Sequence, residues 1–485
     1  MPPPQGLLRS TVLLTAGQIA SYGLSFARNI ILARLLAKAD FGLASLFGMT
    51  LTLLELAGRM SFGQQIIQSK HGDSSAFQAT SQAFQAALAF AGSLLILALS
   101  RPMAQVMNVP QHAWAFATLA VVPLARVFEH LDYSRQQREL NYLPGVLYDV
   151  VPQLVITVAA WPLALWLGDF RVIIWLMIGR ATMGMAMSHL VARQPYRWAW
   201  HGEYARGMWA FGLPLFANGL LIFASQQADQ VVVGAFLSLE SLAMYSLAFS
   251  LVSIPGSIFA QVGTSLMLPI FSRAQDDPDQ FQRQYRTCVE YSSVSAVLLI
   301  LPLIFAGEQF VNLIYGAKYA GTGMIMAVLG AAAAVRFLRI VPAIASMARA
   351  DTMNHLYSNV WRCLSLPLAV AVAAQGGGAV AIGACALLAE IAAAVASVIR
   401  LHRRQGVPLR ASAGAAAYVF GFVGAGLALV AWGAPRWNFW LAMAGLVVLL
   451  SVVILVAWLV FPAAARMLVT AIGLKRRSGI EQPAA

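Results

Sequence analysis

Ionisable side chains interrupt the long apolar stretches of this 485-residue sequence. A charge at the centre of a membrane is costly, so it usually faces the interior of a helix bundle or a water-filled cavity. Arginine is in excess among these residues, and its planar guanidinium binds phosphate or diphosphate bidentately without losing its charge. The pattern favours an anionic ligand, because a cavity for cations would carry carboxylates and aromatic rings. The eight candidates are Arg28, Glu55, Arg59, Asp149, Arg180, Asp229, Arg362 and Glu390.

Some of these charges have a structural interpretation beside the functional one. Glu55 and Arg59 are four residues apart, the spacing at which helical side chains meet, so they either neutralise each other or serve a ligand. Asp149 lies one turn inside a span, where helix capping or loop pairing is favoured. Arg180 lies away from the end of its span, where it cannot easily reach the membrane surface, which favours a paired or ligand-binding role.

Candidate roles therefore divide by charge. The predicted substrate-binding residues are Arg28, Arg59, Arg180, Arg336, Arg339 and Arg362. Arg336 and Arg339 are expected at the cytoplasmic mouth, where they either attract phosphate or anchor their helix. The acidic candidates for coupling or gating are Glu55, Asp149, Asp229 and Glu390.

Motifs for covalent chemistry or resident cofactors do not occur in the sequence. Cys288, Cys363 and Cys385 are scattered, which predicts neither a disulfide framework nor a metal site. The sequence contains no GxxxxGK[ST] phosphate loop, no HExxH and no GxSxG. We expect a protein that is not an enzyme and has no cofactor. Transport would then depend on a proton or sodium gradient, the membrane potential or the gradient of the substrate itself.

Hydrophobic composition defines the elements that must position these charges. Hydrophobic residues make up 60% of the chain and charged residues 11%, whereas soluble domains carry about 25% charge. Apolar runs of about 20 residues suffice to cross a bilayer as helices. Stretches such as Val447–Phe461 lack the alternation of barrel strands. The sequence predicts an all-α integral membrane protein with about fourteen spans, at residues 10–33, 41–67, 79–99, 112–133, 144–167, 171–192, 208–236, 242–270, 287–306, 320–345, 354–375, 379–400, 412–433 and 438–462.

Basic residues indicate the orientation of these spans. Fourteen spans place both termini on one side, where 22 Lys and Arg residues fall, against six in the opposite loops. Such a bias marks the cytoplasmic side, so we expect a multi-pass protein of the cytoplasmic membrane with both termini in the cytoplasm. The net charge of +13 is then mostly a topology signal facing membrane lipid. Nucleic acid is not an expected partner, because no fold presents a basic face to it.

A shift of 201 residues aligns two segments of similar hydropathy, Ala33–Leu46 and Gly234–Leu247. A six-span unit repeated in parallel suits a transporter with two pseudo-symmetric lobes around a central cavity. We predict one lobe at residues 1–200, a second at 201–404, and two accessory helices with a tail at 405–485. The shift places Arg28 and Asp229 at equivalent depths. They either face each other across the cavity or are satisfied inside their own lobes.

Two regions carry a resemblance to a known family. QIASYGLSFARNIILARLLAKADFGLASL, followed by SFGQQIIQSK, resembles the start of bacterial Wzx-type polysaccharide flippases, in the multidrug/oligosaccharidyl-lipid/polysaccharide exporter superfamily. ADQVVVGAFLSLESLAMYSLAFSLVSIP and LPIFSRAQDDPDQF are similar to the seventh and eighth spans of that family. The resemblance covers about Leu13 to Arg404, and its loose motifs identify the family better than the cargo.

The resemblance implies a flippase of the bacterial inner membrane. Its substrate would be an undecaprenyl-diphosphate-linked oligosaccharide repeat unit for O-antigen, capsule or exopolysaccharide, moved by alternating access. A polysaccharide polymerase and a chain-length regulator would be its partners.

Related peptidoglycan-precursor flippases have a first-span FAR segment with its Arg in the cavity, which Phe26, Ala27 and Arg28 match. Asp40 corresponds to their acidic residue beyond that helix, which adds it to the gating candidates, and Arg59 to their second-span Arg. Tyr22 stands where those relatives carry a further Arg, which argues against a peptidoglycan precursor as cargo.

Two other functions remain open on the sequence alone. A drug or cation antiporter of the same superfamily would have twelve spans and a carboxylate-lined first lobe. A membrane-embedded polysaccharide polymerase or ligase would need a sizeable external loop with catalytic groups. The arginine bias disfavours the antiporter, and the short predicted loops disfavour the polymerase or ligase.

Overall fold

The computed structural model describes residues 5–58, 62–433 and 437–461, and describes side chains from residue 13 onward except those of residues 54–58. The described chain is helical apart from turns and the longer non-helical stretch at residues 191–201, as the long apolar runs require. It divides into two units, Met1–Ser246 with Ile314–Lys318 (the N-terminal unit) and Leu247–Leu313 with Tyr319–Ala485 (the C-terminal unit).

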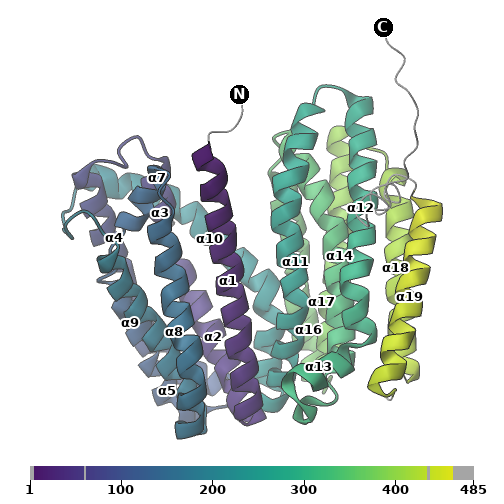
Figure 1. Ribbon diagram of the computed structural model, residues 1–485, viewed down its shortest axis with the longest axis horizontal. Coiled ribbons are helices and arrows are strands. Elements are labelled where there is room, and N and C mark those ends of the chain that lie inside the picture. Colours follow the sequence, from purple (N-terminus) through teal and green to yellow (C-terminus); the bar gives the residue numbers. More distant parts are fainter. Residues whose placement is uncertain (1–4, 59–61, 434–436, 462–485) are drawn as a thin grey trace. The chain divides into compact units, whose positions relative to one another are not determined.

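The N-terminal unit contains the helices up to the start of α11. Figure 1 shows α3 and α7 at the same end of this unit as the start of α1, with α5 at the opposite end. Its elements are α1 (Gln5–Leu35), α2 (Lys38–Gly58), α3 (Phe62–Gln68), α4 (Ser75–Val106), η1 (Pro110–His112), α5 (Ala113–Thr118), α6 (Val121–Arg126), α7 (Asp132–Arg138), α8 (Leu143–Leu167), α9 (Arg171–Leu190), α10 (Gly202–Phe236) and the first residues of α11 (Leu239–Arg273).

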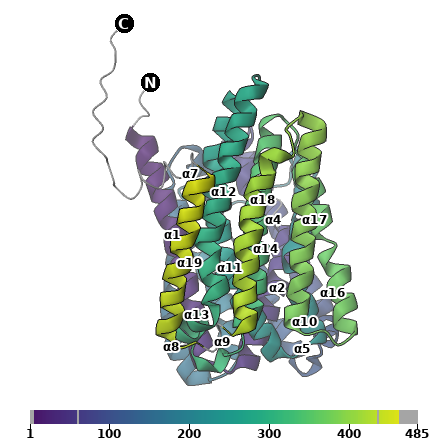
Figure 2. The same ribbon diagram turned by 90° about the vertical axis from the view of Figure 1, so that its right-hand side faces the viewer.

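The C-terminal unit is built around α14, whose residues Gly330–Val335 are all buried. Small side chains let neighbouring helices approach closely in a membrane, and α12, α17 and α18 pack against α14. Figures 1 and 2 show α18 and α19 beside α12. The elements are the remainder of α11, α12 (Pro278–Phe305), α13 (Gly307–Tyr315) as far as Leu313, α14 (Gly323–Ala348), α15 (Met353–Arg362), α16 (Ser365–Ala374), α17 (Ala379–Gln405), α18 (Arg410–Trp432) and α19 (Phe439–Val460). The end of α13 and most of η2 (Ala317–Tyr319) belong to the N-terminal unit.

Membrane-spanning length is common among these helices. Within the described residues, eleven segments are long and apolar enough to cross a membrane. The other three predicted spans fall on α1, on α2 with α3, and on the short helices α5 and α6. The all-α membrane fold is therefore confirmed, the protein is multi-pass, and the expected fourteen spans agree with the helices present.

The predicted lobe boundary at residue 200 precedes α10, whereas the division between the two units falls after Ser246. The division follows packing, since α10 lies against α2 and α4 of the N-terminal unit. Compactness does not measure an internal repeat, so the lobes at 1–200 and 201–404 and the accessory segment at 405–485 stay predictions.

The end of α1 is held by a segment from far along the chain. The Nζ of Lys318 donates hydrogen bonds to the carbonyls of Arg34 at 3.0 Å and Leu36 at 2.6 Å, and the Nε of Arg34 donates to the carbonyl of Ile314 at 2.8 Å. Cations stabilise the C-terminal carbonyls of a helix. This contact explains why Ile314–Lys318 belongs to the N-terminal unit.

The backbones of α2 and the start of α11 approach each other closely at Gly42. A Cβ at this position would overlap the carbonyl oxygen of Leu239, whereas a Cβ at Gly48 on the same helix would meet nothing within 4 Å. Overpacking costs about 1–3 kcal/mol, while Gly→Ala in an open helix position gains up to about 1 kcal/mol. We expect Gly42→Ala to lower the unfolding temperature in detergent and Gly48→Ala to leave it unchanged or raise it. Equal unfolding temperatures would contradict this account of Gly42.

Candidate functional site

Three helices of the N-terminal unit bring polar side chains together in what we name the α1–α8–α9 cluster. Ser21, Ser25 and Arg28 are spaced four and three apart, so they share one face of α1. Asp149 and Gln153 are four apart on α8 and so share one face of that helix, and α8 packs against both α1 and α9. The cluster consists of Ser21, Ser25 and Arg28 on α1, Asp149 and Gln153 on α8, and Arg180 on α9.

Asp149 has two donors within the cluster. Its Oδ2 accepts a hydrogen bond from the hydroxyl of Ser21 at 2.6 Å, and its Oδ1 accepts from Nη2 of Arg180 at 3.0 Å. The side chains of Arg180 and Asp149 are 46% and 43% exposed, so this ion pair contributes little stability on its own. Asp149 therefore orients Arg180 through a contact between α8 and α9, rather than through the helix capping or loop pairing expected for it.

Gln153 accepts from both arginines of the cluster. Its Oε1 takes hydrogen bonds from Nη1 of Arg180 and, at 3.5 Å, from Nη1 of Arg28. Arg28 also donates to the hydroxyl of Ser25 at 3.4 Å. Both Arg28 contacts are long and therefore weak. Among the described residues no carboxylate pairs with Arg28.

Donors exceed acceptors in this cluster. Two guanidinium groups face one carboxylate, which leaves a net charge of +1. The Nε2 of Gln153 is buried and has no hydrogen-bond partner among the described residues, although buried polar groups are almost always paired. A small anion beside Arg28 and Gln153 would supply the missing acceptor atoms, and phosphate oxygens match guanidinium geometry.

A second cluster, the Glu390 cluster, lies inside the C-terminal unit. The Glu390 carboxylate is 2% exposed and meets three guanidinium groups, at 2.8 Å from Arg339, 2.6 Å from Arg362 and 3.6 Å from Arg336. Arg339 also donates to the hydroxyl of Ser358 at 3.1 Å. Three cations around one anion leave a net charge of +2 in a buried position.

Local structure places each of these arginines. Arg336 and Arg339 are three apart on α14 and so share a face. Arg362 is the last residue of α15, and the predicted span 354–375 breaks there before α16 begins at Ser365. A cation is favourable at a helix C-terminus. Arg339 and Arg362 are buried within the unit. Arg339 therefore does not lie at an exposed mouth but pairs with Glu390 inside the helix bundle.

The other predicted residues have separate surroundings. Asp229 is buried, accepts a hydrogen bond from the hydroxyl of Tyr245 at 2.5 Å and another from the backbone N–H of Gln230 at 3.0 Å. Asp40, in the first turn of α2, accepts from the backbone N–H of Phe170. The two alternatives for Arg28 and Asp229, facing each other across the cavity or being satisfied inside their own lobes, stay predictions.

Glu55 and Arg59 lie outside the described side chains.

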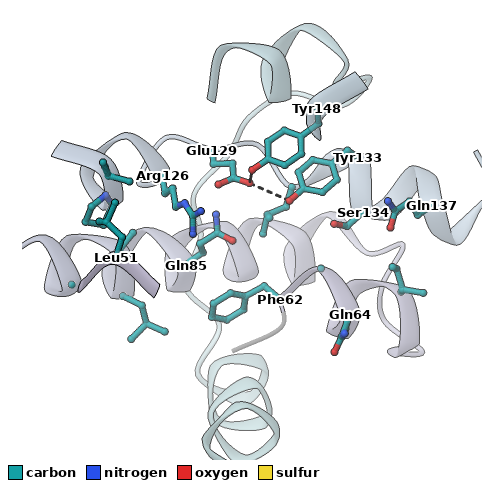
Figure 3. Close-up of a pocket in the computed structure, with 18 of the residues that line it drawn as sticks. Leu51, Phe62, Gln64, Gln85, Arg126, Glu129, Tyr133, Ser134, Gln137 and Tyr148 are labelled. Atoms are coloured by element: carbon teal, nitrogen blue, oxygen red, sulfur yellow. Dashed lines mark hydrogen bonds between the residues drawn. The ribbon is translucent and has the colours of Figure 1, made fainter. Parts of the chain in front are cut away.

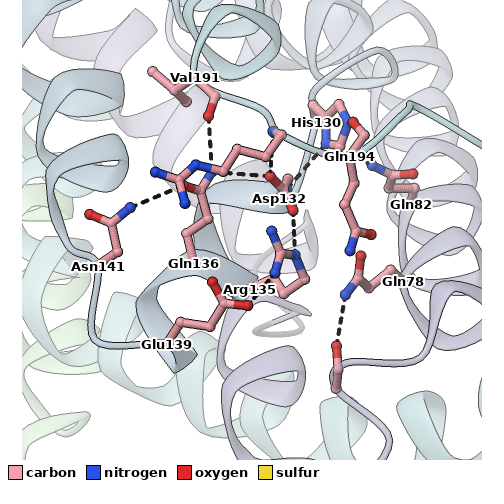
Figure 4. Close-up of polar contacts among 12 residues, drawn as sticks. Gln78, Gln82, His130, Asp132, Arg135, Gln136, Glu139, Asn141, Val191 and Gln194 are labelled. Atoms are coloured by element: carbon pink, nitrogen blue, oxygen red, sulfur yellow. Dashed lines mark hydrogen bonds and ion pairs between the residues drawn. The ribbon is translucent and has the colours of Figure 1, made fainter.

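One polar network near α7 was not anticipated from the sequence (Figure 4). Asp132 is 2% exposed and accepts from Nε of Arg135 at 2.6 Å and from the backbone N–H of Arg193 at 2.7 Å. His130 Nδ1 lies 3.1 Å from the backbone N–H of Asp132, which must donate, so Nε2 carries the proton and donates to the carbonyl of Gln194 at 2.9 Å. These bonds fix the segment after α9 against α7 and have a structural role.

A family model described as polysaccharide biosynthesis protein matches residues 31–323, more than half of the chain. The succinoglycan biosynthesis transport protein ExoT of Rhizobium meliloti is 19% identical over 64% of this chain, and the match covers 62% of ExoT, less than two thirds of its length. The lipopolysaccharide biosynthesis protein WzxC of Escherichia coli is 23% identical, over 76% of this chain and 75% of its own.

Solved structures with the same fold are transporters. The lipid II flippase MurJ, in an inward closed conformation, matches with a TM-score of 0.68 and 12% identity, covering 95% of this chain and 99% of that one. An inward-facing multidrug resistance transporter of the MATE family matches with a TM-score of 0.62 and 13% identity, over 83% and 99%. At these identities the likeness shows the fold alone. The resemblance to Wzx-type flippases is confirmed, and the chain belongs to the polysaccharide biosynthesis protein family.

Proposed function

We propose that the protein is a flippase that moves undecaprenyl-diphosphate-linked oligosaccharide repeat units across the bacterial inner membrane for surface polysaccharide synthesis. Membership of the polysaccharide biosynthesis protein family supports this function. So do two relatives, one described as a succinoglycan biosynthesis transport protein and the other as a lipopolysaccharide biosynthesis protein. The observation that carries the proposal is the excess of hydrogen-bond donors in the α1–α8–α9 cluster. A diphosphate supplies the acceptors that the cluster lacks.

Binding follows from the geometry of the donors. Arg28 is held only by long hydrogen bonds and can turn toward a phosphate oxygen, while Arg180 is already oriented by Asp149. A guanidinium keeps its charge in any surroundings, so the site attracts the diphosphate at every pH of a living cell. Alternating access would then expose the loaded cluster first to the cytoplasm and then to the opposite side, with both termini cytoplasmic.

Coupling to an ion gradient needs a carboxylate that can change its charge or its partners. Glu390 does not suit this role, because three guanidinium groups stabilise its charged form. We assign Glu390 a structural role and propose Asp229, with its short contact to Tyr245, as the coupling candidate for protons or sodium. Asp40, in the first turn of α2, and Asp149, in the α1–α8–α9 cluster, are then positioning residues.

The arginine bias also separates this function from the alternatives. A cationic drug would be repelled by both clusters, so we do not favour the antiporter despite the shared fold. We propose that the chain catalyses no covalent step and passes its product to a separate polymerase with a chain-length regulator.

Transport itself tests the proposal. The purified protein is reconstituted into liposomes with a fluorescent undecaprenyl-diphosphate-linked oligosaccharide from the strain of origin. The fraction accessible to an external, membrane-impermeant quencher of the fluorophore is followed over time. We expect this fraction to rise from about half toward completion only in vesicles that contain the protein. Identical curves with and without protein would overturn the flippase function.

A further inference from the structure

A pocket of about 420 Å³ lies within the N-terminal unit, between α2, α3, α4, α6, α7 and α8 (Figure 3). Sites for small molecules usually measure about 300–1,000 Å³ and combine apolar walls with a few convergent polar groups. This pocket fits that description, since Leu51, Phe62 and Leu88 contribute apolar surface. Its polar lining includes Gln85, Arg126, Glu129, Tyr133, Ser134 and Tyr148.

Glu129 provides a fixed acceptor in the pocket. Its side chain is held by the hydroxyls of Tyr148 at 2.6 Å and Tyr133 at 3.1 Å, both of which donate to Oε1. The two tyrosine rings stack with their centroids 4.5 Å apart. Among the described residues no group donates to Oε2, so this oxygen remains for a donor inside the pocket.

Two opposite charges lie among the described lining residues of the pocket. Arg126 and Glu129 are the charged residues among the described lining, and Figure 3 shows their side chains turned toward the same space, beside the amide of Gln85. An anion would meet Glu129 and a cation would meet Arg126. A neutral molecule with several hydroxyl groups satisfies both, because each hydroxyl donates to a carboxylate and accepts from a guanidinium or an amide.

The pocket also shares a helix with the α1–α8–α9 cluster. Tyr148 lines the pocket, and Asp149, the next residue on α8 and about 100° further round the helix, belongs to the cluster. A ligand that carries a sugar directly attached to a diphosphate has this combination of chemistry, a polyhydroxylated ring beside a double negative charge. The ring of Phe62 offers an apolar surface for the C–H face of such a sugar.

We propose that this pocket binds one neutral sugar ring of the lipid-linked oligosaccharide and contributes to the choice of repeat unit. The proposal rests on the flippase function and adds a site and a ligand class to it.

Gly92 provides a way to fill the pocket without disturbing its walls. It lies in the lining, and a Cβ added there would meet nothing within 4 Å, so Gly92→Leu extends into open space. Gly421→Leu on α18 is the matched control, since that position is exposed and equally open. Glu129→Gln removes the charge while keeping the shape, and Glu240→Gln, at an exposed position in the first turn of α11, controls for it.

The experiment measures equilibrium binding of radiolabelled methyl glycosides of glucose, galactose and N-acetylglucosamine to the full-length protein in lipid nanodiscs. We expect saturable binding of at least one glycoside, weakened tenfold or more by Gly92→Leu and by Glu129→Gln and unchanged in both controls. Tyr148→Phe, which removes a single hydroxyl, serves in place of Glu129→Gln if that variant does not fold, and a smaller loss of affinity is expected from it.

Two results would overturn the pocket while leaving the flippase intact. One is transport of the lipid-linked substrate in liposomes with no saturable glycoside binding, and the other is glycoside binding that the pocket variants do not weaken. Failure of the native protein to transport, by contrast, removes the flippase function itself.

Discussion

The Glu390→Gln variant is expected to be nearly absent from the membrane fraction, or to unfold far below the native protein in detergent. Glu390 is the shared partner of Arg336, Arg339 and Arg362, and its side chain is 2% exposed. Removing one partner from a buried ionic group costs about 3–5 kcal/mol, because the remaining charges stay buried without compensation. Glutamine has the same shape as glutamate, so the variant loses only a negative charge. The net charge of the Glu390 cluster therefore rises from +2 to +3.

A compensating double variant separates this electrostatic explanation from general damage. Glu390→Gln combined with Arg336→Gln restores the native net charge of +2 and removes the arginine with the longest contact, 3.6 Å from the carboxylate. We expect the double variant to unfold at a higher temperature than Glu390→Gln alone. Glu240→Gln, at an exposed position, should match the native unfolding temperature. A native unfolding temperature for Glu390→Gln would refute the buried-charge account.

The helices of this fold are predictable because long apolar runs leave the backbone no other way to satisfy its polar groups in a membrane. The points at which these helices are interrupted are not visible in hydropathy. Predicted span 112–133 is split between α5 and α6 at Leu119–Ala120, and span 354–375 is split at Cys363–Leu364. A hydropathy window passes over both breaks. Each nevertheless lies four residues before a proline, Pro123 or Pro367, which lacks the N–H that would bond to the carbonyl of Leu119 or Cys363.

The candidate site shows a similar limit. Arg339, Arg362 and Glu390 can each be singled out by their charge inside an apolar run, but their meeting depends on how α14, α15 and α17 pack, which the local sequence does not encode. Gln153 escapes a search for ionisable residues because it is neutral. Its spacing of four from Asp149 was the available signal, since it places an amide on the same helix face.

Replacing Arg28 should abolish most transport without harming the fold, the opposite of the effect at Glu390. The contacts of Arg28, at 3.4 and 3.5 Å, are long, and Gln153 keeps its bond to Arg180 when Arg28 is lost. Hydrogen bonds to a charged group contribute about 1.5–3 kcal/mol, which corresponds to roughly a 10- to 150-fold change in affinity. We expect Arg28→Gln to reduce flipping in liposomes by at least tenfold at limiting substrate, with the unfolding temperature near the native value.

Arg28→Lys distinguishes a diphosphate grip from a diffuse charge effect. Lysine keeps the cation but loses the planar fork that binds two phosphate oxygens together, so we expect intermediate flipping, better than Arg28→Gln and below native. Arg206→Gln, which removes an exposed cation at the start of α10 in the same unit, should flip at the native rate. If Arg28→Gln transports as fast as Arg206→Gln, the diphosphate does not bind at Arg28. Flipping by Arg28→Lys at the native rate would show instead that attraction of charge suffices and that two-point geometry contributes nothing.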